Sequence, residues 1–133
     1  MTPRATGTFE VKLVPQPPEA EGDTSLGRLT LDKQFHGDLQ ATSRGQMLTG
    51  MTATKGSAAY VAIEKVEGTL DGRAGTFILQ HRGIMDRGTP ALLVTVVPDS
   101  GTDGLEGLAG TMTIEITGGE HRYVFDYTLP SAL

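Results

Sequence analysis

Apolar and polar residues alternate one by one along most of this chain. In residues 8–14 (TFEVKLV), Phe9, Val11 and Leu13 are separated by polar residues. A period of two places such residues on one face of an extended strand, whereas a helix would repeat them every 3.6 residues. The chain is therefore expected to consist mainly of strands with one buried and one exposed face.

The same pattern predicts eight strands, which the 18 glycines separate into short segments. They are expected at residues 8–14, 28–35, 38–48, 57–67, 76–81, 91–97, 108–116 and 121–129. Asp71-Gly72 and Gly118-Gly119 are typical of two-residue hairpin turns. Residues 98–104 (PDSGTDG) also predict a turn, and the proline-rich residues 15–27 predict an exposed loop.

Residues 57–67 (SAAYVAIEKVE) are the one segment for which a helix competes with a strand. Their alanines and the Glu-Lys pair suit three helical turns. However, Tyr60, Val61, Ile63 and Val66 do not form a stripe of helical period, and β-branched residues occupy the centre. A strand is therefore the preferred interpretation.

Sequential hairpins without a helical crossover favour an up-and-down meander. Closure of the meander would remove the exposed edges of a sheet of this size. We therefore expect an all-β fold: one domain over residues 1–133 that forms a closed eight-stranded antiparallel barrel.

Composition limits the classes of function. The chain has no cysteine, which excludes disulfides, thiolate nucleophiles and zinc–thiolate sites. Its net charge is −5 and its eleven cations are scattered, so no nucleic acid partner is expected. No apolar run could cross a bilayer, and the first residues lack the pattern of a signal peptide. We therefore expect a cytoplasmic protein without a membrane partner.

The interior of an eight-stranded barrel holds either side chains or one small ligand. By phase, the inward face is expected to carry an unusual number of polar and ionisable groups. Its predicted members are Lys33, Phe35, Tyr60, Glu64, Phe77, Leu79, His81, Met112, Ile114, Ile116, His121, Tyr123, Phe125 and Tyr127.

These residue types suggest a site for proton transfer or ligand binding. Burial would raise the pKa of Glu64 and suit it to acid–base work, with His81 and His121 as proton carriers. The expected ligand-binding side chains are Lys33, Phe35, Tyr60, Phe77, Met112, Tyr123 and Tyr127. An equally simple interpretation is a satisfied Lys33–Glu64 ion pair in a filled core. The three histidines lack the spacing of metal ligands, so neither a metal nor another cofactor is expected.

Several long runs resemble the DUF3224 family. They are GRLTLDKQFHGDLQATSRGQML (27–48), KGSAAYVAIEKVEGTLDGRAGTFILQHRGIMDRG (55–88), VTVVPDSGTDGLEGLAG (94–110) and the ending HRYVFDYTL. The resemblance covers roughly residues 6–129 and implies a small bacterial protein with a barrel similar to that of allene oxide cyclase, of the calycin-like kind. Because the family is one of unknown function, the resemblance implies no activity and no catalytic residues.

Three functions stay open. The first is a small-molecule-binding barrel, in one form an isomerase or cyclase that acts on an apolar, oxygenated substrate. The second is a non-enzymatic carrier or sensor that uses the same interior. The third is a structural module with a filled interior whose apolar strand, with Leu92, Val94 and Val96, forms a homo-oligomer.

Overall fold

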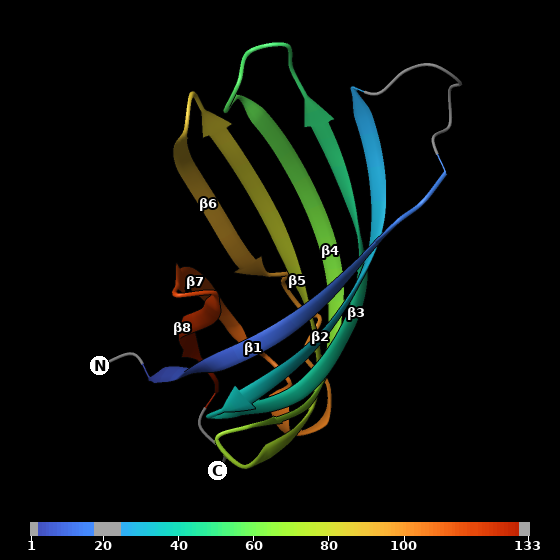
Figure 1. Ribbon diagram of the computed structural model, residues 1–133. Coiled ribbons are helices and arrows are strands. Elements are labelled where there is room, and N and C mark those ends of the chain that lie inside the picture. Colours follow the sequence, from blue (N-terminus) through green and yellow to red (C-terminus); the bar gives the residue numbers. More distant parts are fainter. Residues whose placement is uncertain (1–2, 18–24, 131–133) are drawn as a thin grey trace.

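The computed structural model describes residues 3–17 and 25–130, which form an all-β domain (Figure 1). Its elements in chain order are β1 (Arg4–Pro15), β2 (Leu26–Gly37), β3 (Leu39–Met51), β4 (Ala58–Leu70), β5 (Arg73–Asp86), β6 (Thr89–Val96), the 3₁₀ turn η1 (Asp103–Leu105), β7 (Ala109–Thr117) and β8 (Glu120–Thr128). No helix among these residues is long and apolar enough to cross a membrane.

The strands form a closed antiparallel barrel in the order of the chain. Each strand pairs with its neighbour in sequence, and β1 pairs with β8 over Arg4–Phe9 to close the ring. The predicted up-and-down barrel is therefore confirmed. The segment with helical composition, residues 57–67, forms most of β4, in which Val66 is buried in the core and Val61 and Ile63 are exposed.

Tight turns join the strands where the sequence placed them. Asp71 and Gly72 have φ values of 48° and 83°, and Gly118 and Gly119 have 58° and 82°. Two positive φ values in succession are the signature of the hairpin turn that matches the twist of antiparallel strands. The segment 98–104 leads into η1, which the sequence did not predict and whose Leu105 is fully buried.

Apolar and aromatic side chains fill one end of the barrel, which we call the closed end. Phe77 and Phe125 stack with ring centroids 6.0 Å apart, and Leu105 of η1 belongs to the same cluster of buried residues. The Tyr127 hydroxyl donates a hydrogen bond to Asp71 in the β4–β5 turn. A packed core of this kind ties β8 to the turns at the closed end.

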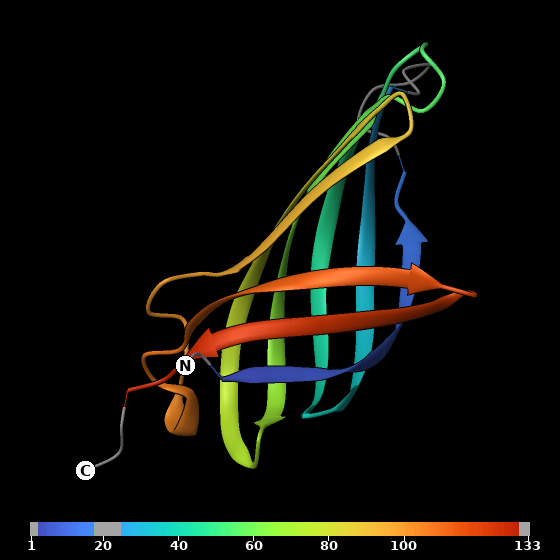
Figure 2. The same ribbon diagram turned by 90° about the vertical axis from the view of Figure 1, so that its left-hand side faces the viewer.

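The other end of the barrel, the open end, carries the β3–β4, β5–β6 and β7–β8 turns and is formed largely by β2–β6 and the second half of β1. Within the described residues, β6 pairs with β7 only at Val94–Met112 and Thr95–Thr111. Figure 2 shows β2–β6 rising well beyond the level at which β7 and β8 cross them. Side chains that share the inward phase of the core are partly or largely exposed here: Leu13, Met47, Tyr60, Met85, Leu92 and Ile116. We call these six residues the mouth.

The apolar strand β6 differs from its expected role. Val94 and Val96 are buried in the core, so they cannot form the outer contact predicted for them. Leu92 shares their phase but lies in the mouth, where it is 40% exposed, and the outward apolar residue is Leu93, which is 52% exposed. The alternation of a strand explains this result, because residues two apart share one face.

Candidate functional site

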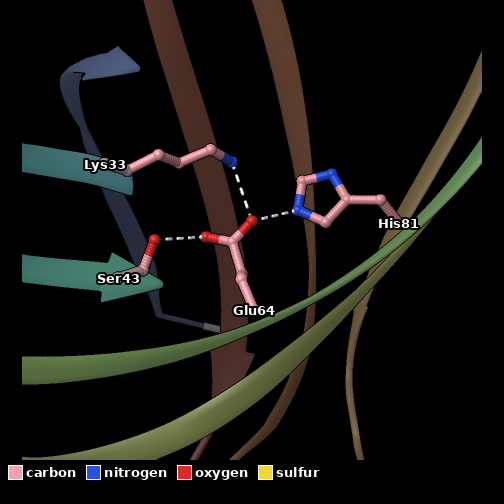
Figure 3. Close-up of polar contacts among 4 residues, drawn as sticks. All are labelled: Lys33, Ser43, Glu64 and His81. Carbon is pink, nitrogen blue, oxygen red and sulfur yellow. Dashed lines mark hydrogen bonds and ion pairs between the residues drawn. The ribbon is translucent and has the colours of Figure 1, made fainter. Parts of the chain in front are cut away.

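Four polar side chains meet inside the barrel, at the boundary between the packed core and the mouth (Figure 3). They come from four successive strands: Lys33 from β2, Ser43 from β3, Glu64 from β4 and His81 from β5. Each belongs to the inward phase of its strand. The side chains of Lys33, Glu64 and His81 are 6%, 0% and 4% exposed, so charge is concentrated where little water reaches it.

Glu64 is the centre of this cluster. Its Oε2 accepts hydrogen bonds from Lys33 Nζ at 2.8 Å and from His81 Nε2 at 2.5 Å. Its Oε1 accepts one from Ser43 Oγ at 2.8 Å. In the described part of the chain, no buried side-chain nitrogen or oxygen lacks a hydrogen-bond partner. The cluster therefore meets the requirement that buried charges be paired and hydrogen-bonded.

The partners reverse the expected pKa shift of Glu64. Burial alone would raise its pKa, as the sequence suggested. The hydrogen bond from His81, the charges of Lys33 and His81, and the hydrogen bond from Lys33 outweigh burial and lower the pKa from 4.5 to about 2. The prediction of a raised pKa is wrong, and Glu64 is an ionised carboxylate at neutral pH.

Aromatic rings enclose the ammonium group of Lys33. Its Nζ lies 4.8 Å from the centroid of the Phe9 ring and 5.7 Å from that of Phe35. A cation over the faces of aromatic rings is attracted by their quadrupoles, most strongly where water is excluded. Lys33 is thus fixed by Glu64 on one side and by the two rings on the other.

His81 presents one ring nitrogen to Glu64 and the other to accessible space. Its one hydrogen bond within the described residues is made by Nε2. Because no buried nitrogen in this part of the chain is unpaired, Nδ1 must reach the accessible surface. Figure 3 shows Nδ1 turned away from Glu64. A carboxylate that holds one imidazole nitrogen fixes the orientation of the other.

Tyr60 lies beside His81 on the side of the mouth, with their ring centroids 6.4 Å apart. Its ring covers Gly83, because a Cβ added to Gly83 would lie only 2.3 Å from Tyr60 Cε1. Burial, followed by the charge of Glu64, raises the pKa of Tyr60, so its hydroxyl keeps its proton at neutral pH. The absence of a side chain at Gly83 thus allows an aromatic ring to lie over the inner wall above His81.

The structure divides the residues predicted for the site into two groups. Lys33, Glu64 and His81 are brought into direct contact, with Phe35 and Tyr60 next to them. His121 forms no hydrogen bond with these residues; its ring packs on Phe9, one of the two rings beside Lys33, with centroids 5.0 Å apart. The other predicted ligand-binding residues are buried in the core: Phe77, Met112, Tyr123 and Tyr127.

Tyr123 has a structural role at that position. Its hydroxyl accepts a hydrogen bond from Leu39 N and donates to His36 O, both at 2.9 Å, and so joins β8 to the β2–β3 turn.

Sequence reasoning missed Ser43, which supplies the third hydrogen bond to Glu64. The signal was present, because Ser43 continues the inward phase of Leu39 and Ala41 on the same strand. A serine there is small enough to be overlooked among core residues, and its role depends on a partner from the neighbouring strand. The described residues contain no group of three or more histidine, cysteine, aspartate or glutamate side chains that could hold a metal ion.

Comparison with known proteins gives a family and a similar structure. A family model described as "Protein of unknown function (DUF3224)" matches residues 5–127. The fold is similar to the crystal structure of a protein of unknown function from the DUF3224 family of Shewanella oneidensis MR-1, with a TM-score of 0.93 and 51% sequence identity. That similarity covers 99% of this chain and 100% of the other. The search of curated proteins finds no match. The chain therefore belongs to the DUF3224 family, whose function is unknown.

Proposed function

We propose that this protein binds a small, largely apolar molecule at the open end of the barrel, with the Lys33–Glu64–His81 cluster beneath it. The observation that carries the proposal is a fully buried, fully paired charge cluster directly below an exposed apolar inner face. Binding sites for small molecules combine apolar walls with a few fixed polar groups in this way.

The packed closed end limits where such a molecule could lie. Phe77, Leu79 and Phe125 are buried together there, so the binding region proposed here excludes that half of the barrel. The mouth has the opposite character, since Leu13, Met85 and Ile116 share the inward phase of the core but remain exposed. Burial of their apolar surface by a ligand would be favourable by roughly 25 cal/mol per Å².

A catalytic form of this proposal, an isomerase or cyclase, depends on a different group from the one expected. Glu64 is ionised and saturated by three donors, so it is a poor proton donor. The observation that favours catalysis concerns Nδ1 of His81. Glu64 fixes the orientation of the ring through Nε2, and no described residue forms a hydrogen bond with Nδ1. Proton transfer would therefore be assigned to His81.

Two neighbouring leucines allow a matched test. Leu92 lies in the mouth, whereas Leu93 points outward and is exposed to a similar extent. Fluorescence titration with the apolar dye N-phenyl-1-naphthylamine should show saturable binding to the protein. Leu92→Arg should weaken this binding at least about tenfold, because a guanidinium at the apolar wall is costly to desolvate. Leu93→Arg should leave it unchanged.

Thermal denaturation of both variants separates lost binding from lost structure. The proposal would be rejected if the dye did not bind saturably. It would also be rejected if the two variants affected binding equally while both remained folded.

A further inference from the structure

The position of Lys33 points to the reactive group of the ligand: we infer that the molecule bound in the mouth is an apolar aldehyde, which Lys33 holds covalently as a protonated imine. This inference rests on the proposed function and adds the chemical class of the ligand. It makes Lys33, and not Glu64 or His81, the residue that forms a bond with the ligand.

Lys33 differs in position from every other lysine of the chain, which has four. Lys12, Lys55 and Lys65 are exposed, whereas the side chain of Lys33 lies inside the barrel and is only 6% exposed. A lysine usually extends its stem until the ammonium group reaches water. Lys33 instead reaches from β2 to Glu64 on β4 (Figure 3). Its amine therefore lies where a ligand that entered through the mouth would meet it.

The reaction of this amine with an aldehyde keeps the charge of the cluster. The C=O bond of the aldehyde breaks, a C=N bond forms, and the oxygen leaves as water with two hydrogens of the ammonium group. The third hydrogen and the positive charge stay on nitrogen. The proton that leaves Lys33 before its attack on the carbonyl carbon returns to the imine nitrogen, so no other reactant is needed. Oε2 of Glu64 therefore keeps a cationic N–H partner, and the charge of His81 does not enter the balance.

The surroundings of Lys33 favour the protonated imine more than water does. An ammonium group is compact and strongly hydrated, and little water reaches it here. The imine spreads its charge over a flat C=N group, and a delocalised cation is hydrated more weakly, as the guanidinium of arginine shows. The rings of Phe9 and Phe35, with centroids 4.8 Å and 5.7 Å from Nζ, attract either cation. The equilibrium should therefore lie further toward the imine at Lys33 than at an exposed lysine.

The inner face next to the cluster determines the rest of the ligand. Beyond the four cluster residues, toward the open end, the inward residues of β2–β6 carry no charged side chain; the largest are Leu29, Met47, Tyr60, Met85 and Leu92. An aldehyde with an apolar body would bury that body here, which brings its carbonyl group to Lys33 at a high effective concentration. A charged or strongly hydrated aldehyde would lose hydration without a compensating contact.

Reductive trapping tests the inference on the protein without substitutions. Sodium cyanoborohydride reduces a protonated imine to a stable secondary amine, and peptide mass spectrometry then locates the modified lysine. With 2-naphthaldehyde at low concentration and neutral pH, Lys33 should be modified at least about tenfold more than any exposed lysine, because binding in the mouth raises the local concentration of the aldehyde. Modification of Lys33 equal to or below that of Lys12, Lys55 and Lys65 would overturn the inference.

Two controls connect the modification to the mouth. Glycolaldehyde has the same reactive group without an apolar body, so it should show no preference for Lys33. Saturating N-phenyl-1-naphthylamine should protect Lys33 from 2-naphthaldehyde and leave the exposed lysines unprotected. A preference for Lys33 that glycolaldehyde shares, or that the dye does not reduce, would contradict an apolar ligand held in the mouth.

A matched pair of variants identifies the nitrogen without a reducing agent. Lys33→Arg keeps a cation for Glu64 but cannot form an imine, and Lys65→Arg makes the same change at an exposed position. The protonated imine of 4-(dimethylamino)cinnamaldehyde absorbs at longer wavelength than the free aldehyde. We expect this band with Lys65→Arg and its loss with Lys33→Arg. A band of equal size in both variants would assign the imine to another amine and overturn the inference.

The outcomes separate this inference from the proposed function. Saturable binding of N-phenyl-1-naphthylamine without preferential modification of Lys33 would remove the aldehyde from the proposal and leave the binding site in the mouth. Absence of both dye binding and Lys33 modification would overturn the proposed function, and this inference with it.

Discussion

Glu64 lies among apolar side chains, an environment that by itself disfavours an ionised carboxylate. Lys33, Ser43 and His81 each donate a hydrogen bond to it. The hydrogen bonds and charges of His81 and Lys33 reverse the effect of burial on its pKa. The pKa of Glu64 is consequently lowered from 4.5 to about 2. At the scale of the residue, the hydrogen bonds and charges of its partners therefore decide whether this carboxyl group is ionised.

The lowered pKa predicts how stability depends on pH. The unfolded chain binds a proton at Glu64 near pH 4.5, whereas the folded chain binds it near pH 2. The stabilisation is thus fully present above about pH 4.5 and is lost as the pH falls through about 2. Its size is about 3 kcal/mol in the free energy of unfolding. Urea denaturation between pH 2 and 6 should show this loss.

Two variants isolate the part that belongs to Glu64. Glu64→Gln removes the titrating group, so its free energy of unfolding should fall less steeply between pH 4.5 and 2 than that of the unmodified protein. Lys33→Met keeps an apolar stem beside Phe9 but removes one donor, so it should shrink the acid-dependent loss without abolishing it. An acid dependence as steep in Glu64→Gln as in the unmodified protein would contradict this assignment.

The sequence predicted the positions of these residues better than their chemistry. Period-two alternation correctly placed Lys33, Glu64 and His81 inside the barrel, because that period fixes the face of a strand. It could not predict the sign of the pKa shift. That sign depends on which side chains of four different strands reach one carboxylate, and the tilt and register of the barrel decide this.

At the scale of the element, the β4–β5 pair connects the cluster to the mouth. Its register places Ala62 opposite His81 and Tyr60 opposite Gly83. The Tyr60 ring lies across the backbone of Gly83, an arrangement in which an aromatic side chain covers a glycine on the adjacent strand. This pairing positions the aromatic surface beside His81.

A methyl group at Gly83 should displace that ring. In Gly83→Ala the new Cβ would lie 2.3 Å from Tyr60 Cε1, which is closer than two carbon atoms that are not bonded to each other can approach. We expect the Tyr60 ring to swing away, at a cost of about 1 kcal/mol in the free energy of unfolding. Urea denaturation measures the cost, and the ring resonances of Tyr60 in an NMR spectrum report the displacement.

Gly50 on β3 provides the control, because a Cβ there would meet no atom within 4 Å and its φ is not in the left-handed region. Gly50→Ala should therefore be neutral or slightly stabilising. In a Tyr60→Ala background the cost of Gly83→Ala should largely disappear, since the ring that it displaces is absent. A cost that persists in that background would show that the clash lies elsewhere.

At the scale of the whole molecule, the barrel is closed along only part of its length. Every residue of β4 pairs with both neighbouring strands, from Ala58 to Leu70. In contrast, β6 and β7 meet at two adjacent positions of each strand, so Thr89–Leu93 pairs with β5 alone among the described residues. The sequence predicted a closed barrel, but it did not predict how short the pairing of β6 with β7 is, because alternation fixes the face of a strand and not the length over which it pairs.

This unequal closure predicts unequal protection of the backbone against hydrogen exchange. Amides open more readily where strands pair on one side and bury little apolar surface. Hydrogen–deuterium exchange measured by mass spectrometry should therefore show the slowest exchange in β4 and faster exchange in Thr89–Leu93. Measurement at two protein concentrations provides the control, because a second copy that covered β6 would slow its exchange at the higher concentration. Protection of Thr89–Leu93 equal to that of β4 at both concentrations would contradict the partly open barrel, and with it the exposed inner face on which the proposed binding site depends.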